Sequence, residues 1–134
     1  MKTKIKTIKS VFNYLPKDEE VKTFDKFKKV ATKDEVAYRL IKLFTRALNK
    51  EANGGKIWIP DYRPGNNEYK YEIWFNIKAN DKYPAGFGFS NSACDDWRTG
   101  TDVGSRLCFK SRELGYYAAK QFLKIYKDFI LMSN

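Results

Sequence analysis

Histidine is absent from this chain of 134 residues. Because histidine is the commonest general base and a frequent ligand of transition metals, its absence excludes Ser-His-Asp and Cys-His catalysis and the HExxH type of zinc site. The sequence also contains no phosphate-binding loop, no GxGxxG dinucleotide motif and no GxSxG nucleophile elbow. We therefore predict a protein that is not an enzyme, that has no catalytic residues and that needs no cofactor.

Cysteine is scarce and long apolar runs are missing. Cys94 and Cys108 are the only cysteines; two are too few for a disulfide framework, and without histidine or a second pair they cannot form a zinc site, so we expect two reduced thiols. No apolar run approaches the roughly 18 residues of a membrane-spanning helix, and residues 1–10 lack the apolar stretch of a signal peptide. These absences predict a cytoplasmic protein with no membrane partner.

Positive charge is abundant instead. The chain has 26 Lys and Arg against 16 Asp and Glu, a formal charge of +10. Such a balance is typical of proteins whose partners carry phosphate, because Lys and Arg neutralise phosphates and release counterions. Net charge alone predicts only nonspecific association, so a basic protein without such a partner remains the alternative. The 43% apolar and 16% aromatic residues predict a single folded domain over residues 1–134.

The C-terminal stretch, residues 104–130, carries the clearest pattern. Leu107 and Phe109 alternate with polar positions, which predicts a short strand. After Ser111, a good N-cap residue, the period changes to three or four residues. The sequence therefore predicts one long amphipathic helix after Ser111, the longest in the chain, with an apolar stripe formed by Leu114, Ala118, Phe122, Ile125 and Phe129.

Further helices are predicted in the first half. Thr32 and Glu35 form a capping box before an apolar stripe, so we expect a helix from about residue 33 to residue 50 that ends at Gly54 and Gly55. Its basic outer face is either solvated or in contact with phosphate; it comprises Arg39, Lys42, Arg46 and Lys50. Residues 1–31, with two short helical patterns, are predicted to be a mobile or separately packed segment of the domain.

Alternating apolar residues predict strands at residues 56–59, 69–78, 86–89 and 106–109. The expected fold is α+β: an antiparallel meander of three to four strands, covered on one face by the N-terminal helices and the long C-terminal helix. Residues 91–103 have no periodic pattern and predict a long polar loop. Asp95, Asp96 and Asp102 lie in it, but their spacing fits no EF-hand, so we predict no metal site.

The open face of this sheet is the candidate binding surface. Aromatic rings interleaved with basic residues are the arrangement by which single-stranded nucleic acids are stacked and tracked, and each stacked base contributes roughly 1 to 3 kcal/mol. The alternatives are that the same face is covered by the N-terminal helices or a partner subunit, or that it forms a small-ligand pocket. The predicted nucleic-acid or anion-binding residues are Trp58, Arg63, Lys70, Trp74, Lys78 and Arg98.

Four stretches resemble a family of small uncharacterised proteins from phages and prophages of gut Bacteroidales. They read IKLFTRALN (41–49), WIPDY (58–62), NEYKYEIWFNI (67–77) and GSRLCFKSRELGYYAAKQFLKIYKDFI (104–130). The resemblance covers residues 33–130, and its GSRLCFKSREL core is the most specific part. It implies a viral protein that acts in the host cytoplasm or belongs to the virion, and it carries no established activity and no functional residues.

We therefore predict a non-enzymatic, phage-associated protein that binds nucleic acid or another phosphate-bearing ligand through a basic, aromatic surface. Two alternatives stay open. One is a structural or assembly protein of the virion. The other is an inhibitor of a host antiviral defence, acting by sequestering a nucleotide signal or masking a host protein.

Overall fold

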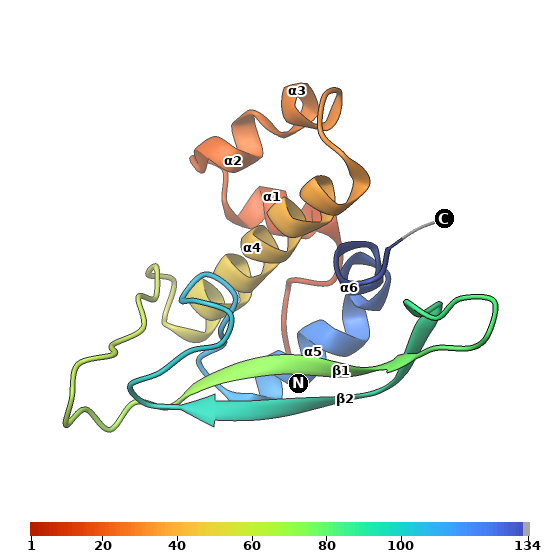
Figure 1. Cartoon of the computed structure of the whole chain (residues 1–134). Helices are drawn as coiled ribbons and strands as arrows, with labels where there is room; N and C mark the ends of the chain where they lie inside the picture. Colours follow the sequence, from red (N-terminus) through yellow and green to blue (C-terminus); the bar gives the residue numbers. More distant parts are fainter. Residues whose placement is uncertain (133–134) are drawn as a thin grey trace.

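A central helix, α4 (Lys33–Ala52), runs through the middle of the fold (Figure 1). The computed structural model describes residues 1–132. Helices α2 and α3 lie on the side of α4 that faces away from a two-stranded hairpin, and α5 and α6 lie next to that hairpin (Figure 1). The other elements are α1 (Ile8–Tyr14), α2 (Glu19–Lys22), α3 (Phe24–Lys28), β1 (Lys70–Lys78), β2 (Gly88–Trp97), α5 (Arg112–Gln121) and α6 (Leu123–Ile130).

The predicted helix over residues 33–50 is confirmed as α4. Thr32 and Glu35 form the expected capping box at its start, which satisfies backbone N–H groups that have no partner inside the helix. After Asn53 the chain leaves helical geometry, and Gly54 and Gly55 adopt φ values of +67° and +85°. Glycine suits these positions because a Cβ atom disfavours positive φ.

Aromatic rings fill the core where α4 meets the C-terminal helices. The Phe44 ring, fully buried, stacks on Phe122 with centroids 4.4 Å apart and meets Tyr126 edge-on at 5.4 Å. The prediction of one long C-terminal helix is wrong in one respect: the backbone leaves helical geometry at Phe122, which divides the segment into α5 and α6. Phe122, at the break, and Tyr126 both contact Phe44, and α4 is the longest helix of the described residues.

The N-terminal segment is part of this core. Ile5 and Val11 are fully buried, and the Tyr117 hydroxyl donates a hydrogen bond of 2.6 Å to the carbonyl of Ile5. Leu15 belongs to the same cluster of buried side chains. The prediction that residues 1–31 are mobile or separately packed is therefore wrong, because their apolar side chains pack directly against α4 and α5.

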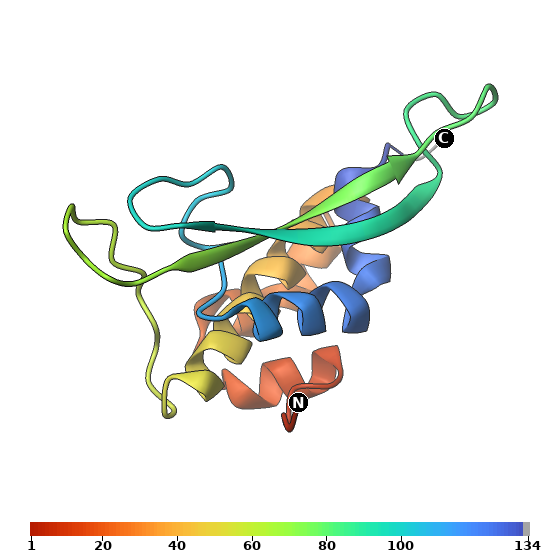
Figure 2. The same cartoon turned by 90° about the horizontal axis from the view of Figure 1, so that it is seen from below.

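The sheet consists of one antiparallel hairpin. Figure 2 shows the hairpin lying across the helices on one side of the molecule. β1 and β2 pair with Ile73 opposite Cys94, and a bulge at Asn76 and Ile77 shifts the register. Gly115 of α5 is buried beneath this pair, and a Cβ atom at Gly115 would lie 2.9 Å from Cδ1 of Ile73. The absence of a side chain at Gly115 thus allows α5 to approach the sheet closely.

Residues 1–132 contain two strands, so the mixed helix and sheet is observed but a meander of three to four strands is not. Residues 56–59 have no strand partner. Residues 106–109 make a single bridge, Tyr71 with Phe109. On the other side of this segment, the Asn49 side chain of α4 binds its backbone: Nδ2 donates to the Cys108 carbonyl, and Oδ1 accepts from the Lys110 N–H, both at 2.9 Å.

The predicted polar loop over residues 91–103 is wrong in its first half. Residues 91–97 belong to β2 and pair with β1. The sequence shows no alternation there because Cys94, which faces Ile73, is the one buried side chain of β2 in this part. Strand β2 therefore depends more on its pairing with β1 than on an alternation of apolar and polar residues in its own sequence.

The basic face of α4 is neutralised inside the molecule. Lys42 lies 2.6 Å from Glu20 of α2, and Arg46 pairs with both Asp18 and Glu20. The Arg39 guanidinium lies 3.7 Å from the centroid of the Phe27 ring. This face is therefore neither freely solvated nor available for phosphate over most of its length, because α2 and α3 cover it.

This ion-pair cluster predicts a pH dependence of stability. Partial burial raises the pKa of Glu20, but hydrogen bonds from Lys42 and Arg46 outweigh burial and leave the pKa below its ordinary value. A carboxyl group whose pKa is lowered on folding stabilises the folded protein at pH values above its unfolded-state pKa. This stabilisation is lost as the pH falls through the folded-state pKa. We expect Glu20→Gln to lower the free energy of unfolding at pH 7 by about 1 to 2 kcal/mol.

Urea unfolding at a series of pH values measures both effects. Between about pH 5 and pH 3 the stability of Glu20→Gln should change less than that of the unmodified protein. Glu19→Gln is the matched control, because the Glu19 side chain is 80% exposed and pairs only with Lys22 among the described residues. Equal acid sensitivity of the Glu20→Gln variant and the unmodified protein would contradict this account.

Candidate functional site

The fold separates the six residues of the predicted binding platform, and Lys70 is the first that it removes from the surface. Lys70 is fully buried. Its ammonium donates to the backbone carbonyls of Asp61, Glu68 and Arg98 and lies 4.6 Å from the centroid of the Tyr62 ring. Lys70 therefore holds two loops onto the sheet, which removes it from the predicted ligand-binding platform.

The neighbouring residue on the same face of β1 is also covered. Glu72 is 4% exposed, and its carboxylate accepts hydrogen bonds from the Thr101 hydroxyl and from the Asp102 N–H at 3.1 Å. Together, Lys70 and Glu72 tie residues 98–102 over one end of the sheet face that sequence reasoning expected to be open. Two buried charges with satisfied hydrogen bonds are a structural feature here and not a binding surface.

The other end of this face is open. Trp74 is 42% exposed, and Lys78 is also exposed on the same side of β1. The structure therefore brings these two predicted residues onto one surface.

The remaining predicted residues lie elsewhere. Arg63 is bound to Asp61 at 2.7 Å, and hydrogen bonds from Arg63 hold the pKa of Asp61 well below its usual range. The Arg98 guanidinium lies 5.6 Å from the centroid of the Tyr69 ring. The Trp58 indole N–H donates to Glu68 at 3.2 Å, in the loop that follows α4. Trp58, Arg63 and Arg98 are therefore held by local contacts of the loops.

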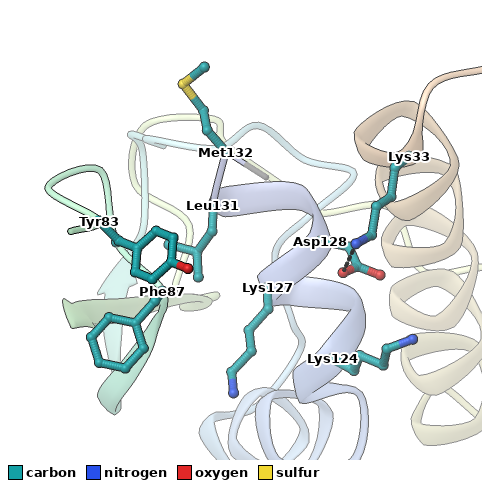
Figure 3. A pocket seen from close by; sticks show the side chains of 9 residues that line it. Lys33, Tyr83, Phe87, Lys124, Lys127, Asp128, Leu131 and Met132 are labelled. Carbon is teal, nitrogen blue, oxygen red and sulfur yellow. Dashed lines mark ion pairs between the residues drawn. The ribbon is translucent and has the colours of Figure 1, made fainter. Parts of the chain in front are cut away.

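A cleft of about 450 Å³ lies at the opposite end of the hairpin, between its tip and α6. We call it the tip cleft. Figure 3 shows the Tyr83 and Phe87 rings of the hairpin tip across from α6, which carries Lys124 and Lys127. Its lining residues are Lys33, Tyr83, Gly86, Phe87, Lys124, Lys127, Asp128, Leu131 and Met132.

The backbone at Gly86 shapes this cleft. Gly86 has a φ of +107°, and a Cβ atom there would lie 2.3 Å from Cγ2 of Ile77. Only glycine fits both the backbone conformation and the space. The turn therefore brings the chain back against β1, which leaves Phe87 52% exposed beside the cleft.

Two of the four charged side chains that line the tip cleft have no ion-pair partner among the described residues. Lys33 pairs with Asp128 at 3.3 Å (Figure 3). Within residues 1–132, neither Lys124 nor Lys127 forms an ion pair. Two ammonium groups in a cleft with the exposed Phe87 ring and the half-buried Tyr83 ring can bind an anion that also carries a flat apolar group.

The tip cleft is not predicted from the sequence, because the residues that line it come from three segments that are distant along the chain. The available signals were the Tyr83 and Phe87 rings around a turn and the basic residues Lys120, Lys124 and Lys127, which are spaced by four and three positions. On a helix this spacing places all three on one face. Nothing in the sequence indicates that this face lies near the hairpin tip.

The described residues show little sign of nucleophilic or metal chemistry. Burial raises the pKa of the Cys94 thiol to about 11 and also raises the pKa of Cys108, so both thiols are protonated at neutral pH. Across residues 1–132, no group of three or more Cys, Asp or Glu side chains is placed to hold a metal ion. None of the described helices is both long and apolar enough to cross a membrane.

Comparison of the chain with protein-family models, with curated proteins and with solved structures gave no match.

The buried role of Lys70 gives a stability prediction. Replacing Lys70 with Met keeps most of its volume but leaves the Asp61 and Glu68 carbonyls without this donor and the Arg98 carbonyl with only a 3.5 Å hydrogen bond from Asn66, so we expect the free energy of unfolding to fall by about 2 to 4 kcal/mol. Lys78→Met, on the same strand but exposed, should change it by less than about 0.5 kcal/mol. Urea denaturation of both variants checks this, and equal stabilities would contradict the role assigned to Lys70.

Proposed function

We propose that this protein binds single-stranded nucleic acid at the tip cleft and has no catalytic activity. The observation that carries the proposal is one cleft lined by the exposed Phe87 ring, the half-buried Tyr83 ring and two lysines without ion-pair partners among the described residues, Lys124 and Lys127. Rings accept unstacked bases, while ammonium groups accept the phosphates between them. Each feature alone is common on protein surfaces, but their combination in one cleft favours a ligand that is both anionic and flat.

The basic surface continues on both sides of the cleft. On the hairpin, the Lys82 ammonium lies 5.2 Å from the centroid of the Tyr83 ring, and the Lys78 carbonyl accepts from the Phe87 N–H at 2.8 Å. On the helix side, Lys124 lines the cleft with Lys127, and Lys120 is exposed near the end of α5. A strand of several nucleotides would thus meet lysines before and after the rings, which agrees with the charge of +10.

A single strand fits this arrangement better than a duplex. Stacking on Phe87 requires a base that is free of its own neighbours. No basic helix of the described residues is arranged with a free face long enough to lie along a groove, because the basic face of α4 is covered by α2 and α3. The open face with Trp74 and Lys78 is a second place where the same strand could bind.

The resemblance to phage proteins stays a prediction, and so do the roles in virion assembly and in inhibition of host defence. An assembly role would require the exposed rings to be buried between copies. A binding role requires them to stay accessible in the isolated protein. Size measurement by analytical ultracentrifugation before the binding experiments separates these alternatives.

The lysines of the tip cleft provide the first test. We expect the double variant Lys124→Ala/Lys127→Ala to bind a labelled oligonucleotide of about 12 nucleotides at least 10-fold more weakly at low salt. The slope of log affinity against log salt should fall by about 1.4, because each phosphate contact on a single strand contributes about 0.7. Fluorescence anisotropy at several salt concentrations measures both quantities.

The matched control is Lys26→Ala/Lys28→Ala on α3, which removes the same charge from another exposed surface. Equal losses in the two double variants would show that binding follows net charge alone and would end the proposal.

The ring of Phe87 provides an independent test. Loss of a stacked ring costs about 1 to 3 kcal/mol, so Phe87→Ala should weaken binding by about 10-fold or more without changing the salt slope. Trp74→Ala is the comparison on the open face of the sheet. If Trp74→Ala weakens binding and Phe87→Ala does not, the tip cleft is the wrong site and the face predicted from sequence is the right one.

A further inference from the structure

The outer edge of strand β1 carries backbone groups without a partner. In an antiparallel pair, every second residue points its N–H and C=O away from the other strand. Tyr71 is such a residue, because it exchanges two hydrogen bonds with Phe109, of 2.9 and 2.7 Å, on the side away from β2. By the same alternation, Ile73 and Phe75 point their backbone groups to that side. Within residues 1–132, these groups have no hydrogen-bond partner.

The segment that pairs with Tyr71 turns away before it reaches the next outward residue. A continued antiparallel pairing would place Leu107 beside Ile73. Instead, the Leu107 N–H donates to the Gly104 carbonyl at 3.3 Å in a turn. The outer edge of β1 is therefore covered at Tyr71 and unpaired at Ile73 and Phe75.

The outer edge of β2, by contrast, is protected. The Arg112 guanidinium donates to the Cys94 carbonyl at 2.8 Å and to the Asp96 carboxylate at 3.3 Å. β2 also contains an extra residue, Ser90, which interrupts its register with β1. Charged side chains and bulges commonly keep an edge strand from pairing with another chain. Because β1 has no extra residue over Lys70–Lys78, only β1 offers a regular, unpaired edge.

The side chains beside this edge indicate which strand would fit it. Trp74 and Lys78 are exposed on the open face of β1, whereas Ile73 and Phe75 are half-buried on the helix face. An added strand would place alternate side chains over the two faces. Apolar side chains suit the positions beside Ile73 and Phe75. An acidic side chain suits the position near Lys78, which has no ion pair within residues 1–132.

We propose that the outer edge of β1 binds an extended, acidic segment of a partner protein, which adds to the hairpin as a third strand. In this mode of recognition the backbone supplies affinity and alternate side chains supply specificity. The two N–H and two C=O groups of Ile73 and Phe75 make the backbone contacts. The charge of +10 favours an acidic segment over a second copy of this chain, because two copies repel each other. Neither Ile73 nor Phe75 lines the tip cleft, so the proposal does not depend on nucleic-acid binding there.

Amide hydrogen exchange of the isolated protein, followed by NMR, tests whether the edge is free. The N–H groups of Ile73 and Phe75 should exchange at least about 10-fold faster than those of Glu72 and Trp74, which point toward β2. Equal protection of the two pairs would show that the edge is already covered and would overturn the proposal.

A synthetic peptide tests the partner. The probe is a capped peptide of about seven residues in which valine alternates with threonine and a glutamate stands at each end. We expect it to bind with a dissociation constant below about 1 mM and to slow the exchange of the Ile73 and Phe75 amides. NMR titration of the unmodified protein measures both effects.

Two control peptides separate backbone pairing from other contacts. N-methylation of the alternate residues whose N–H groups face β1 keeps every side chain but should weaken binding at least about 10-fold. N-methylation of the other residues should leave binding unchanged, because their N–H groups face solvent. Replacing both glutamates with lysine should weaken binding at least about 3-fold.

Several results would overturn the proposal. It fails if the glutamate peptide does not bind at millimolar concentration, if the two N-methylated forms bind equally well, or if the lysine form binds as tightly. It fails as well if analytical ultracentrifugation shows a dimer in which the Ile73 and Phe75 amides are protected, because the occupant is then a second copy. Lys124→Ala/Lys127→Ala should bind the peptide as the unmodified protein does, and loss of binding in this variant would place the peptide in the tip cleft instead.

Discussion

The burial of α4 is the constraint on which the rest of the structure depends. A helix that crosses the middle of a small domain must cover polar as well as apolar side chains, and each covered polar group needs a partner. Glu20 and Asp18 supply partners for Lys42 and Arg46, which fixes α2 against α4. Asn49 binds the backbone at Cys108 and Lys110, which fixes the segment before α5 against α4.

The same constraint distributes the charge of the molecule. Seven basic side chains form ion pairs within the described residues, including the three on the covered face of α4. Lys70 is used internally as well, through backbone carbonyls. The formal charge of +10 therefore says little about any one surface. What distinguishes the tip cleft is that Lys124 and Lys127 lack such partners while two rings lie beside them.

The tip cleft is open, and the exposed Phe87 ring suits a strand that passes over the surface. It lies where segments distant in sequence meet, the hairpin tip against α6. Such junctions are common places for binding sites, because packing leaves irregular gaps there.

Local patterns in the sequence determined the helices and their ends. The capping box at Thr32 and Glu35 and the N-cap at Ser111 depend on residues at most three positions apart, so short-range rules are sufficient for them. The alternation of apolar and polar residues also predicts strand β1. By contrast, β2 over residues 91–97 depends on its pairing with β1, and Phe122 at the helix break stacks on the Phe44 ring, seventy-eight positions earlier.

Only the tertiary structure decided which polar residues are free. Lys70 and Lys78 stand on the same strand and look equivalent in sequence, yet one is buried under two loops and the other is exposed. Likewise, Thr45 and Asn49 are neighbours on α4, but only Asn49 meets backbone groups that can pair with it. The physical reason is that burial and pairing depend on segments that are distant in sequence, and the composition of one segment does not indicate which others will cover it.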